Sequence, residues 1–283
     1  MIDKALVSIR FGRAAPRYAL HARVQEHAAN ALLEAIRVRA PGLRAQGGRP
    51  LRALRILELG SGTGLLTRRL LDLFPGANLL GVDIAPGMVA EATRRLGARG
   101  AHFLVADLDR TFPAGPFDLI ASSMALQWLD DPASCLARAS QRLSPSGLFA
   151  MVAPVQGTLP ELQDSYRRAA QALRLRAWRY PGLAFHPAEA WAGWARAAFD
   201  RVESALEVVT ERHGDVRSLL RSIRGVGANG GSSGPSPGGL ALLRAALDGY
   251  DRDHRVGDGV VATWRLGTLV AERRAGCVEL AGA

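Results

Sequence analysis

The feature that most constrains this chain is the segment 55–64, RILELGSGTG, where an apolar run ends in glycines at every second position. Residues 55–59 are typical of a short strand buried in a parallel sheet, and residues 65–74 are typical of a helix. Glycines let the backbone approach a ligand closely, and a helix N-terminus offers free N–H groups. A strand, a glycine turn and a helix in this order therefore predict a cradle for a small molecule.

The spacing of the glycines excludes the dinucleotide fingerprint G-x-G-x-x-G. Counted from Gly60, the last position of that fingerprint is Leu65, and counted from Gly62 it is Thr67. What remains is the pattern E-x-G-x-G-x-G, which begins at Glu58.

A second apolar strand, residues 78–83, ends in an acid. Asp83 follows Gly60 at a distance close to the roughly 20 residues at which an acid meets ribose hydroxyls in doubly wound nucleotide folds. The alternative is that Asp83 caps the next helix, and one carboxylate can do both. With the glycine turn upstream, we favour the ribose role.

Strands and helices alternate through the first half of the chain, which predicts a parallel sheet wound on both faces. The strands are expected at 55–59, 78–83, 102–107, 117–123 and 148–153, and the helices between them at 65–74, 86–96 and 131–143. Beyond Pro154 the rhythm changes, with helices expected at 159–178, 188–199, 215–223 and 240–250 and strands at 201–211 and 259–272. Residues 225–239 are rich in Gly, Ser and Pro and predict a mobile loop.

This rhythm divides the chain into four parts. We expect an N-terminal helical cap at 1–50, a small-molecule-binding core at 51–154, a helical lid insertion at 155–200, and a C-terminal part at 201–283 that completes the sheet.

Composition limits the classes of protein. The chain has 283 residues, 48% of them hydrophobic, yet no apolar stretch is long enough to cross a membrane. Its N-terminus lacks the layout of a signal peptide, and Cys135 and Cys277 have no metal-like spacing. These observations favour a reduced cytoplasm.

The net charge is +10, and Lys4 is the only lysine among 36 basic residues. Such an excess of arginine reflects either a compositional bias or an acidic partner, nucleic acid or protein. No aromatic-rich basic motif of the RNA-binding type is present.

The pattern beginning at Glu58 resembles the first motif of the Rossmann-like S-adenosylmethionine (SAM) methyltransferases. This resemblance implies an α/β fold with a mostly parallel seven-stranded sheet, helices on both faces and a helical lid insertion. It implies that Asp83 holds the ribose diol, while Asp107 takes the exocyclic amine of the adenine. The cofactor-binding residues that it implies are Glu58, Gly60, Ser61, Gly62, Gly64, Asp83, Ile84, Met88, Asp107, Leu108, Ser122 and Ser123.

Some of these residues have expected roles of their own. Leu108 would offer its backbone N–H to the adenine. Ile84 and Met88 would flank the ring as apolar walls, although ordinary core packing is an equal reading for Met88.

The segment after the fourth strand distinguishes substrate classes. Enzymes that methylate exocyclic amines of nucleic acids usually carry Asn/Asp-Pro-Pro-Tyr/Phe there, whereas this chain has SSMALQW at 122–128. Residues 125–131 instead resemble enzymes that esterify small carboxylates, namely trans-aconitate methyltransferase and the malonyl-[acyl-carrier protein] O-methyltransferases of biotin synthesis.

The second of these families resembles more of the chain, from about residue 8 to 250. Residues 11–18 look like its N-terminal F-x-R-A-A-x-x-Y, residues 157–166 look like its segment after the fifth strand, and residues 217–229 look like its lid helix. The resemblance implies a cytoplasmic, SAM-dependent carboxyl O-methyltransferase that acts on malonyl carried by acyl-carrier protein. The alternatives are a methyltransferase of a free acid such as trans-aconitate and a SAM-binding protein without turnover.

The implied chemistry is simple. Free carboxyls titrate near pH ~4, so a carboxylate nucleophile is already ionised and needs neither a general base nor a metal. Catalysis then reduces to alignment and removal of water. Tyr18 and His21 are candidate catalytic residues at the mouth of the site, and His186 is either a lid residue or an exposed loop residue.

The partners follow from the same resemblance. We expect an acyl-carrier protein, no nucleic acid, no membrane, and a monomer. An arginine suits recognition of the malonyl carboxylate through its bidentate fork, but nothing in the sequence selects one. A basic face for an acidic carrier protein would include Arg10, Arg13, Arg17, Arg217, Arg221 and Arg224.

Overall fold

The structure, a computed structural model, describes residues 2–44, 53–228 and 238–273. One eight-stranded sheet runs through the molecule in the order β3-β2-β1-β4-β5-β8-β6, with the short β7 paired to β8. The strands are β1 (Arg55–Leu59), β2 (Asn78–Asp83), β3 (Ala101–Val105), β4 (Phe117–Ser123), β5 (Leu143–Pro154), β6 (Arg201–His213), β7 (Arg255–Val256) and β8 (Gly259–Glu272).

The first five strands are mutually parallel, and β8 runs antiparallel to both β5 and β6. The predicted α/β fold with a mostly parallel sheet is therefore confirmed, with the two-residue β7 in addition to the seven expected strands. The helices are α1 (Lys4–Ala14), α2 (Arg23–Arg44), α3 (Leu65–Leu73), α4 (Pro86–Leu96), α5 (Pro132–Arg142), α6 (Pro160–Ala172), α7 (Ala188–Ala198), α8 (Val216–Gly225) and α9 (Gly239–Asp253), with 3-10 turns at Ala15–Leu20, Gly97–Arg99 and Leu126–Trp128.

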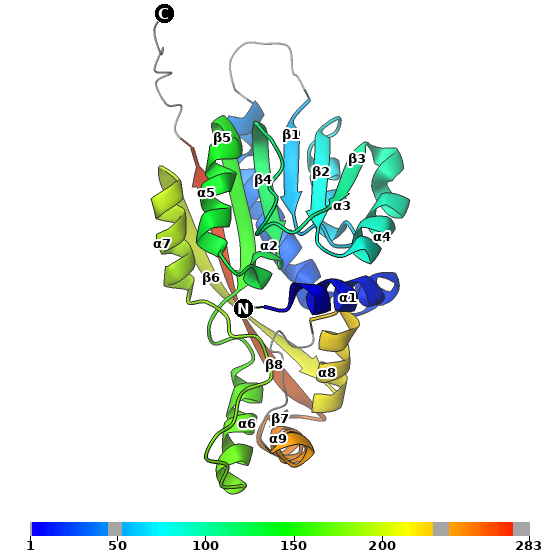
Figure 1. Ribbon diagram of the computed structural model, residues 1–283, viewed down its shortest axis with the longest axis vertical. Coiled ribbons are helices and arrows are strands. Elements are labelled where there is room, and N and C mark those ends of the chain that lie inside the picture. Colours follow the sequence, from blue (N-terminus) through cyan, green and yellow to red (C-terminus); the bar gives the residue numbers. More distant parts are fainter. Residues whose placement is uncertain (1, 45–52, 229–237, 274–283) are drawn as a thin grey trace, which may run out of the picture.

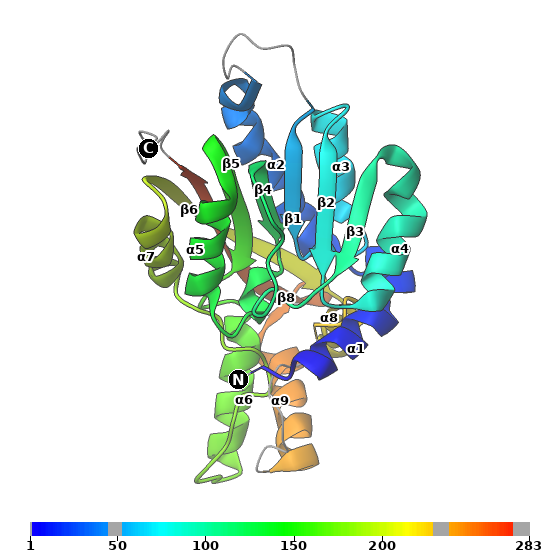
Figure 2. The ribbon, with the colours of Figure 1, turned by 45° about the horizontal axis from the view of Figure 1, so that its top comes forward.

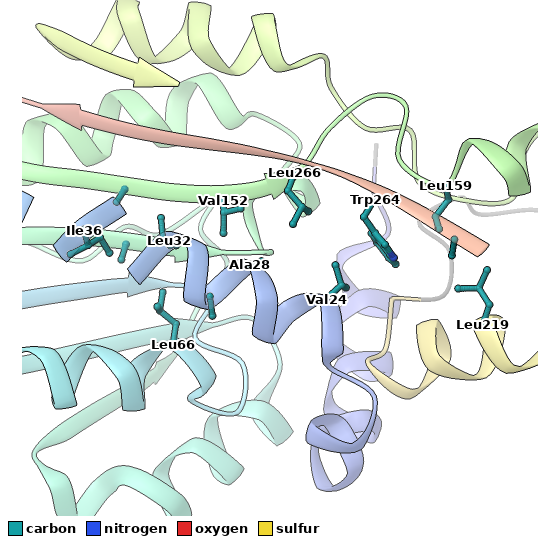
Figure 3. Close-up of a cluster of buried hydrophobic side chains, with 14 of the residues drawn as sticks. Val24, Ala28, Leu32, Ile36, Leu66, Val152, Leu159, Leu219, Trp264 and Leu266 are labelled. Atoms are coloured by element: carbon teal, nitrogen blue, oxygen red, sulfur yellow. The ribbon is translucent and has the colours of Figure 1, made fainter. Parts of the chain in front are cut away.

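The central strands β1, β4 and β5 bury both faces, as their apolar runs predict. Ile56 of β1 packs with α2 and α3 on one face, whereas its neighbour Leu57 packs with α5 and α7 on the other. Figure 3 shows the apolar stripe of α2, which includes Leu32 and Ile36, turned toward Val152 of β5. Because successive side chains of a strand alternate between faces, one apolar run builds both layers of the core.

The insertion after β5 divides between two places. The buried side chains of α7, such as Trp191 and Ala195, belong to the core layer against the sheet. In contrast, α6 packs on α9 beside the far ends of β6 and β8, below the parallel strands (Figure 1). The helix expected at 159–178 ends at Ala172, because Arg174 has a left-handed backbone with φ of 52°. Much of the loop expected at 225–239 lies outside the described residues.

The N-terminal segment also divides. Helix α2 covers a face of the sheet, whereas α1 crosses the carboxyl edge of the parallel strands, close to α8 (Figures 1 and 2). The hydroxyl of Ser8 donates to the carbonyl of Ile84, just after β2, at 3.0 Å. A Cβ on Gly87 of α4 would lie 2.7 Å from the carbonyl oxygen of Gly12, so this close approach of α1 to α4 requires glycine. Within the residues described, no helix is long and apolar enough to span a membrane.

Candidate functional site

The glycine turn after β1 opens onto a cavity at the carboxyl edge of the sheet. Gly60 and Gly62 have positive φ values of 73° and 52°. The backbone N–H groups of Gly60 and Ser61 donate to the carbonyl of Val82 at 2.7 and 2.9 Å, which ties the turn to β2. A Cβ on Gly60 would lie 2.0 Å from the Cβ of Ala125, whereas a Cβ on Gly62 would meet nothing within 4 Å. The turn is therefore packed on one side and open on the side that a ligand could approach.

Asp83 joins this turn to the end of β2. Its two carboxylate oxygens accept the backbone N–H groups of Gly62 and Ala85, each at 2.9 Å. Burial raises the pKa of Asp83, while these backbone donors oppose the shift. The N-cap residue of α4 is Ala85, so Asp83 does not occupy the cap position that the alternative reading gave it. Its carboxylate also lines the cavity, which is the placement that a ribose-binding role requires.

The cavity collects residues from five segments of the chain. Of the predicted site residues, it brings together Tyr18, Gly60, Gly62, Asp83, Ile84, Met88, Asp107, Leu108 and Ser123. The other lining residues are Lys4, Val7, Phe11, Ala106, Met124, Ala125, Trp128 and Leu129. Acceptors at Asp83 and Asp107 flank apolar walls at Ile84 and Met88, an arrangement that suits a nucleoside with a ribose diol and a flat ring.

A smaller depression adjoins the glycine turn and contains the remaining predicted acid. Glu58 is buried, and the hydroxyl of Thr67 on α3 donates to it. Burial raises the pKa of Glu58 to about 8, the Thr67 hydrogen bond opposes this shift, and the charge of Asp83 adds to it. The Ser61 hydroxyl and the Oε1 atom of Gln25 are buried here without a hydrogen-bond partner among the described residues. Unpaired buried polar atoms beside an open glycine turn fit a site for a polar ligand group, such as the amino-acid end of SAM.

Two predicted cofactor residues have structural roles instead of lining either cavity. The Ser122 hydroxyl is fully buried and donates to the carbonyl of Leu59 at 2.8 Å, which links β4 to β1. Gly64 begins α3 with φ of 84°, and a Cβ there would lie 2.4 Å from a methyl group of Leu96. Ser122 therefore fixes the end of β1 against β4, and Gly64 allows α3 to begin close to Leu96.

The candidate histidines do not line the first cavity. His21 lines a separate surface depression together with Arg212 and Arg221. The ring of His186 packs edge-on against Trp194, with 4.9 Å between ring centroids. Of the two residues expected at the mouth of the site, the structure brings Tyr18 to the cavity and leaves His21 outside it.

A second, larger cavity adjoins the first. The two share Phe11, Tyr18, Met124 and Trp128 in their linings, and the rings of Phe11 and Trp128 meet edge-on at 5.4 Å. The second cavity is otherwise lined by Gln25, Gln127, Pro154, Leu159, Leu162, Tyr166, Tyr180, Pro181, Gly182, Leu183, Phe185, Leu220, Ile223, Arg224, Val226, Ala228, Leu243 and Trp264. Most of this lining is apolar or aromatic, and it comes chiefly from α6, α8, α9 and the segment before α7.

Tyr18 stands where the two cavities meet. Burial raises its pKa, and the charge of Asp83 adds to the shift. The phenol is therefore neutral at physiological pH and can donate a hydrogen bond without carrying charge. A group placed beside Tyr18 touches both cavities, so this junction is where two bound molecules could react.

Sequence reasoning missed several residues of these cavities. Lys4 lines the first cavity and Gln25 lines the second, yet each stands in an amphipathic helix where a polar residue predicts only a solvated face. As the only lysine in an arginine-rich chain, Lys4 carried a signal that could have marked it. Nothing in the local sequence distinguishes Gln25. In the part of the chain that the structure describes, no group of His, Cys, Asp and Glu side chains could hold a metal ion.

Known structures are similar to this chain over most of its length. The YcgJ protein from Bacillus subtilis superposes with a TM-score of 0.57 at 13% identity, covering 88% of this chain and 99% of that one. At this identity the similarity shows the fold alone. A family model described as a methyltransferase domain matches residues 57–151, which include the glycine turn.

Curated relatives are similar in sequence from end to end. A malonyl-[acyl-carrier protein] O-methyltransferase from Geobacter sulfurreducens is 34% identical over 281 residues, covering 96% of this chain and 100% of that protein. A protein of the same name from Bacillus anthracis is 31% identical over 264 residues, covering 93% of this chain and 95% of that protein. The chain therefore belongs to the malonyl-[acyl-carrier protein] O-methyltransferase family and is a SAM-dependent methyltransferase.

Proposed function

We propose that this enzyme methylates the free carboxylate of a malonyl group held as a thioester on acyl-carrier protein, an early step of biotin synthesis. The observation that supports this proposal is that two cavities adjoin each other and share Tyr18 and Phe11 in their linings. One cavity has the acceptors and apolar walls that suit SAM. The other is larger and is lined mostly by apolar and aromatic side chains. The names of its relatives supply the substrate class.

In the first cavity, Asp83 would accept hydrogen bonds from the ribose diol, and Asp107 with the N–H of Leu108 would meet the adenine. Ile84 and Met88 would hold the ring between them. The depression with Ser61 and Gln25 would take the amino-acid end of the cofactor, since its buried polar atoms lack partners within the described residues. The reactive methyl group would then point past Tyr18 into the second cavity.

The reaction requires alignment and no proton transfer. SAM supplies a methyl group on a positively charged sulfur, and the substrate carboxylate forms a new C–O bond as the C–S bond breaks and its electron pair remains on sulfur. Phe11, Trp128 and Tyr18 would exclude water from this point, which removes the hydration shell that makes a carboxylate a poor nucleophile. The neutral phenol of Tyr18 can orient the carboxylate without protonating it.

The second cavity favours a thioester over a free polyacid. Trans-aconitate carries three carboxylates, and the described lining of this cavity offers one cationic side chain among many apolar ones. Three carboxylates would lose their hydration there with too few partners, which is costly. A malonyl thioester presents one carboxylate and an uncharged remainder, so it suits this cavity better.

A methyl-transfer assay with labelled SAM tests the proposal on three substrates: malonyl-acyl-carrier protein, malonyl-CoA and trans-aconitate. We expect base-labile label in the malonyl thioesters and little in trans-aconitate. Preferred labelling of trans-aconitate would support the free-acid alternative. Tight binding of SAM without labelling of any substrate would support a SAM-binding protein without turnover.

A further inference from the structure

The second cavity has one charged side chain in its described lining, and that side chain is Arg224 of α8. The described lining of this cavity contains no aspartate or glutamate. The neighbouring residues 229–237, NGGSSGPSP, contain no Lys, Arg or His. A bound anion therefore has one obvious partner here, in a chain with 36 basic residues.

Among the described residues, Arg224 has no acidic partner. Elsewhere in the described chain, arginines on nearby elements pair with acids, as Arg168 of α6 does with Asp164 and Asp253. No acidic side chain of the described residues lies within ion-pair distance of Arg224, and the side chain is exposed as well as lining the cavity. Its guanidinium therefore stands at the rim of the cavity with its donors available to a ligand.

Two glycines fix this position. A Cβ on Gly225 would lie 2.2 Å from the ring of His21, and a Cβ on Gly227 would lie 2.9 Å from the Cα of Phe11. Gly227 also has a positive φ of 82°. The end of α8 can therefore lie directly against the N-terminal segment, close to Phe11 at the junction of the two cavities.

The surroundings of Arg224 include a second donor. Tyr166 of α6 lines the same cavity and is largely buried. Burial raises the pKa of Tyr166, and the positive charge of Arg224 opposes this shift. The neutral phenol of Tyr166 is therefore a second hydrogen-bond donor in the lining of the cavity that contains Arg224.

We propose that Arg224 binds the free carboxylate of the acyl substrate and so selects malonyl over uncharged acyl thioesters. This inference rests on the proposed function and adds its specificity-determining residue. A guanidinium can hold one or both carboxylate oxygens in a planar fork. If Arg224 holds the carboxylate at the edge of the second cavity, one carboxylate oxygen can face the methyl donor. The apolar lining of the cavity then accommodates the thioester end of the substrate.

The test uses two small thioesters so that docking of a carrier protein does not contribute. S-malonyl-N-acetylcysteamine serves as the substrate, and S-acetyl-N-acetylcysteamine, which lacks the carboxylate, is tested as a competitive inhibitor. We expect Arg224→Gln to lower kcat/KM for the malonyl thioester by roughly 10- to 100-fold, since hydrogen bonds to charged groups have this strength. Arg224→Lys should recover part of the loss, because it restores charge without the fork.

Two further readouts separate recognition from damage to the fold. The inhibition constant of the acetyl thioester and the calorimetric Kd of SAM should be unchanged in Arg224→Gln. Arg244→Gln is the matched control, since Arg244 is an exposed arginine of neighbouring α9 that lines neither cavity. That control should keep kcat/KM within about twofold of the wild type.

The outcomes also separate this inference from the proposed function. If the wild type does not methylate malonyl thioesters, the proposed function fails. If the wild type is active and Arg224→Gln is equally active, the function stands and the role of Arg224 is wrong. Equal loss of affinity for the malonyl and acetyl thioesters would also overturn the inference, because Arg224 would then hold the thioester arm.

Discussion

The ammonium group of Lys4 lies 2.5 Å from a carboxylate oxygen of Asp109 and also donates to the carbonyl of Trp128. Both side chains of the ion pair are mostly buried, with 19% and 15% of their surface exposed. Asp109 in turn accepts the backbone N–H groups of Asp130 and Asp131. The start of α1 is thereby fastened to two loops that border the cofactor cavity, so α1 forms a wall of that cavity.

We expect Lys4→Met to weaken SAM binding by roughly tenfold, since a buried charged hydrogen bond contributes about 1.5–3 kcal/mol and part of this holds α1 in place. Calorimetric titration measures the change. Arg94→Met is the control, because Arg94 pairs with Glu91 on the exposed side of α4 and lines neither cavity. Equal SAM affinity in the two variants would mean that α1 keeps its position without Lys4.

Substitution of Asp83 should separate binding from support of the turn. Asp83→Asn keeps one of the two backbone acceptors and loses the charge, so SAM should bind roughly 10- to 100-fold more weakly, with a smaller loss of stability than in Asp83→Ala. Asp83→Ala also leaves the N–H groups of Gly62 and Ala85 without their acceptor, and should lower the free energy of unfolding by about 1–3 kcal/mol as well. Calorimetry and urea unfolding give the two quantities. Unchanged SAM affinity in both variants would remove Asp83 from the site.

The buried carboxyl of Glu58 should make stability depend on pH. Its pKa is raised to about 8 in the folded chain from an ordinary value of 4.5. The folded state therefore binds more protons than the unfolded state between these values, and stability falls as pH rises through this window. Glu58→Gln stays neutral throughout and should show a flatter curve of unfolding free energy from pH 5 to 8.5. Parallel curves for the two proteins would contradict the raised pKa.

Hydrogen exchange should divide the insertion after β5 into two parts. Backbone amides of α6 and α8, which line the second cavity, should gain protection when S-adenosylhomocysteine and a malonyl thioester bind, because closure must exclude water. Amides of α7 pack in the core layer and should be protected with or without ligand. Equal protection of α6 and α8 in both states would indicate a site that is already closed.

The outer face of α8 should serve an acidic carrier protein. Arg217 and Arg221 are exposed there, and Arg221 lies beside Arg212 in the depression behind the second cavity. Reversing Arg217 and Arg221 to Glu should lower kcat/KM for malonyl-acyl-carrier protein several-fold more than for malonyl-CoA. Salt should act in the same selective way, since screening extends over ~8–10 Å near physiological ionic strength.

The control for this charge reversal replaces Arg94 and Arg95 of α4 with Glu. It changes the net charge by the same amount on a helix that is distant from α8 in the sequence. If both malonyl substrates respond alike to salt and to either reversal, the carrier does not dock on α8, and the arginine excess has no role in this encounter.

Local patterns in the sequence determined the parallel sheet and the cofactor turn. Residues 78–83, 86–96, 117–123 and 259–272 have in the structure the bounds that the sequence predicts. The positions of Gly60, Gly62 and Asp83 follow from the same source, because parallel strands end at one edge and carry their following residues with them. The periodicity of a strand or a helix depends on a short segment alone, and so does a glycine that permits a positive φ. Such local features can be read directly from the sequence.

Tertiary structure decided which residues complete the cavities. Lys4, Gln25 and Arg224 come from α1, α2 and α8, and no local sequence pattern places any of them at a cavity. These side chains reach the cavities only because segments distant in the sequence pack closely together. Gly227 packs against Phe11 in this way, and Gly87 packs against Gly12. These contacts depend on how whole helices and strands pack together. No single segment of the sequence therefore shows which arginine lines the second cavity.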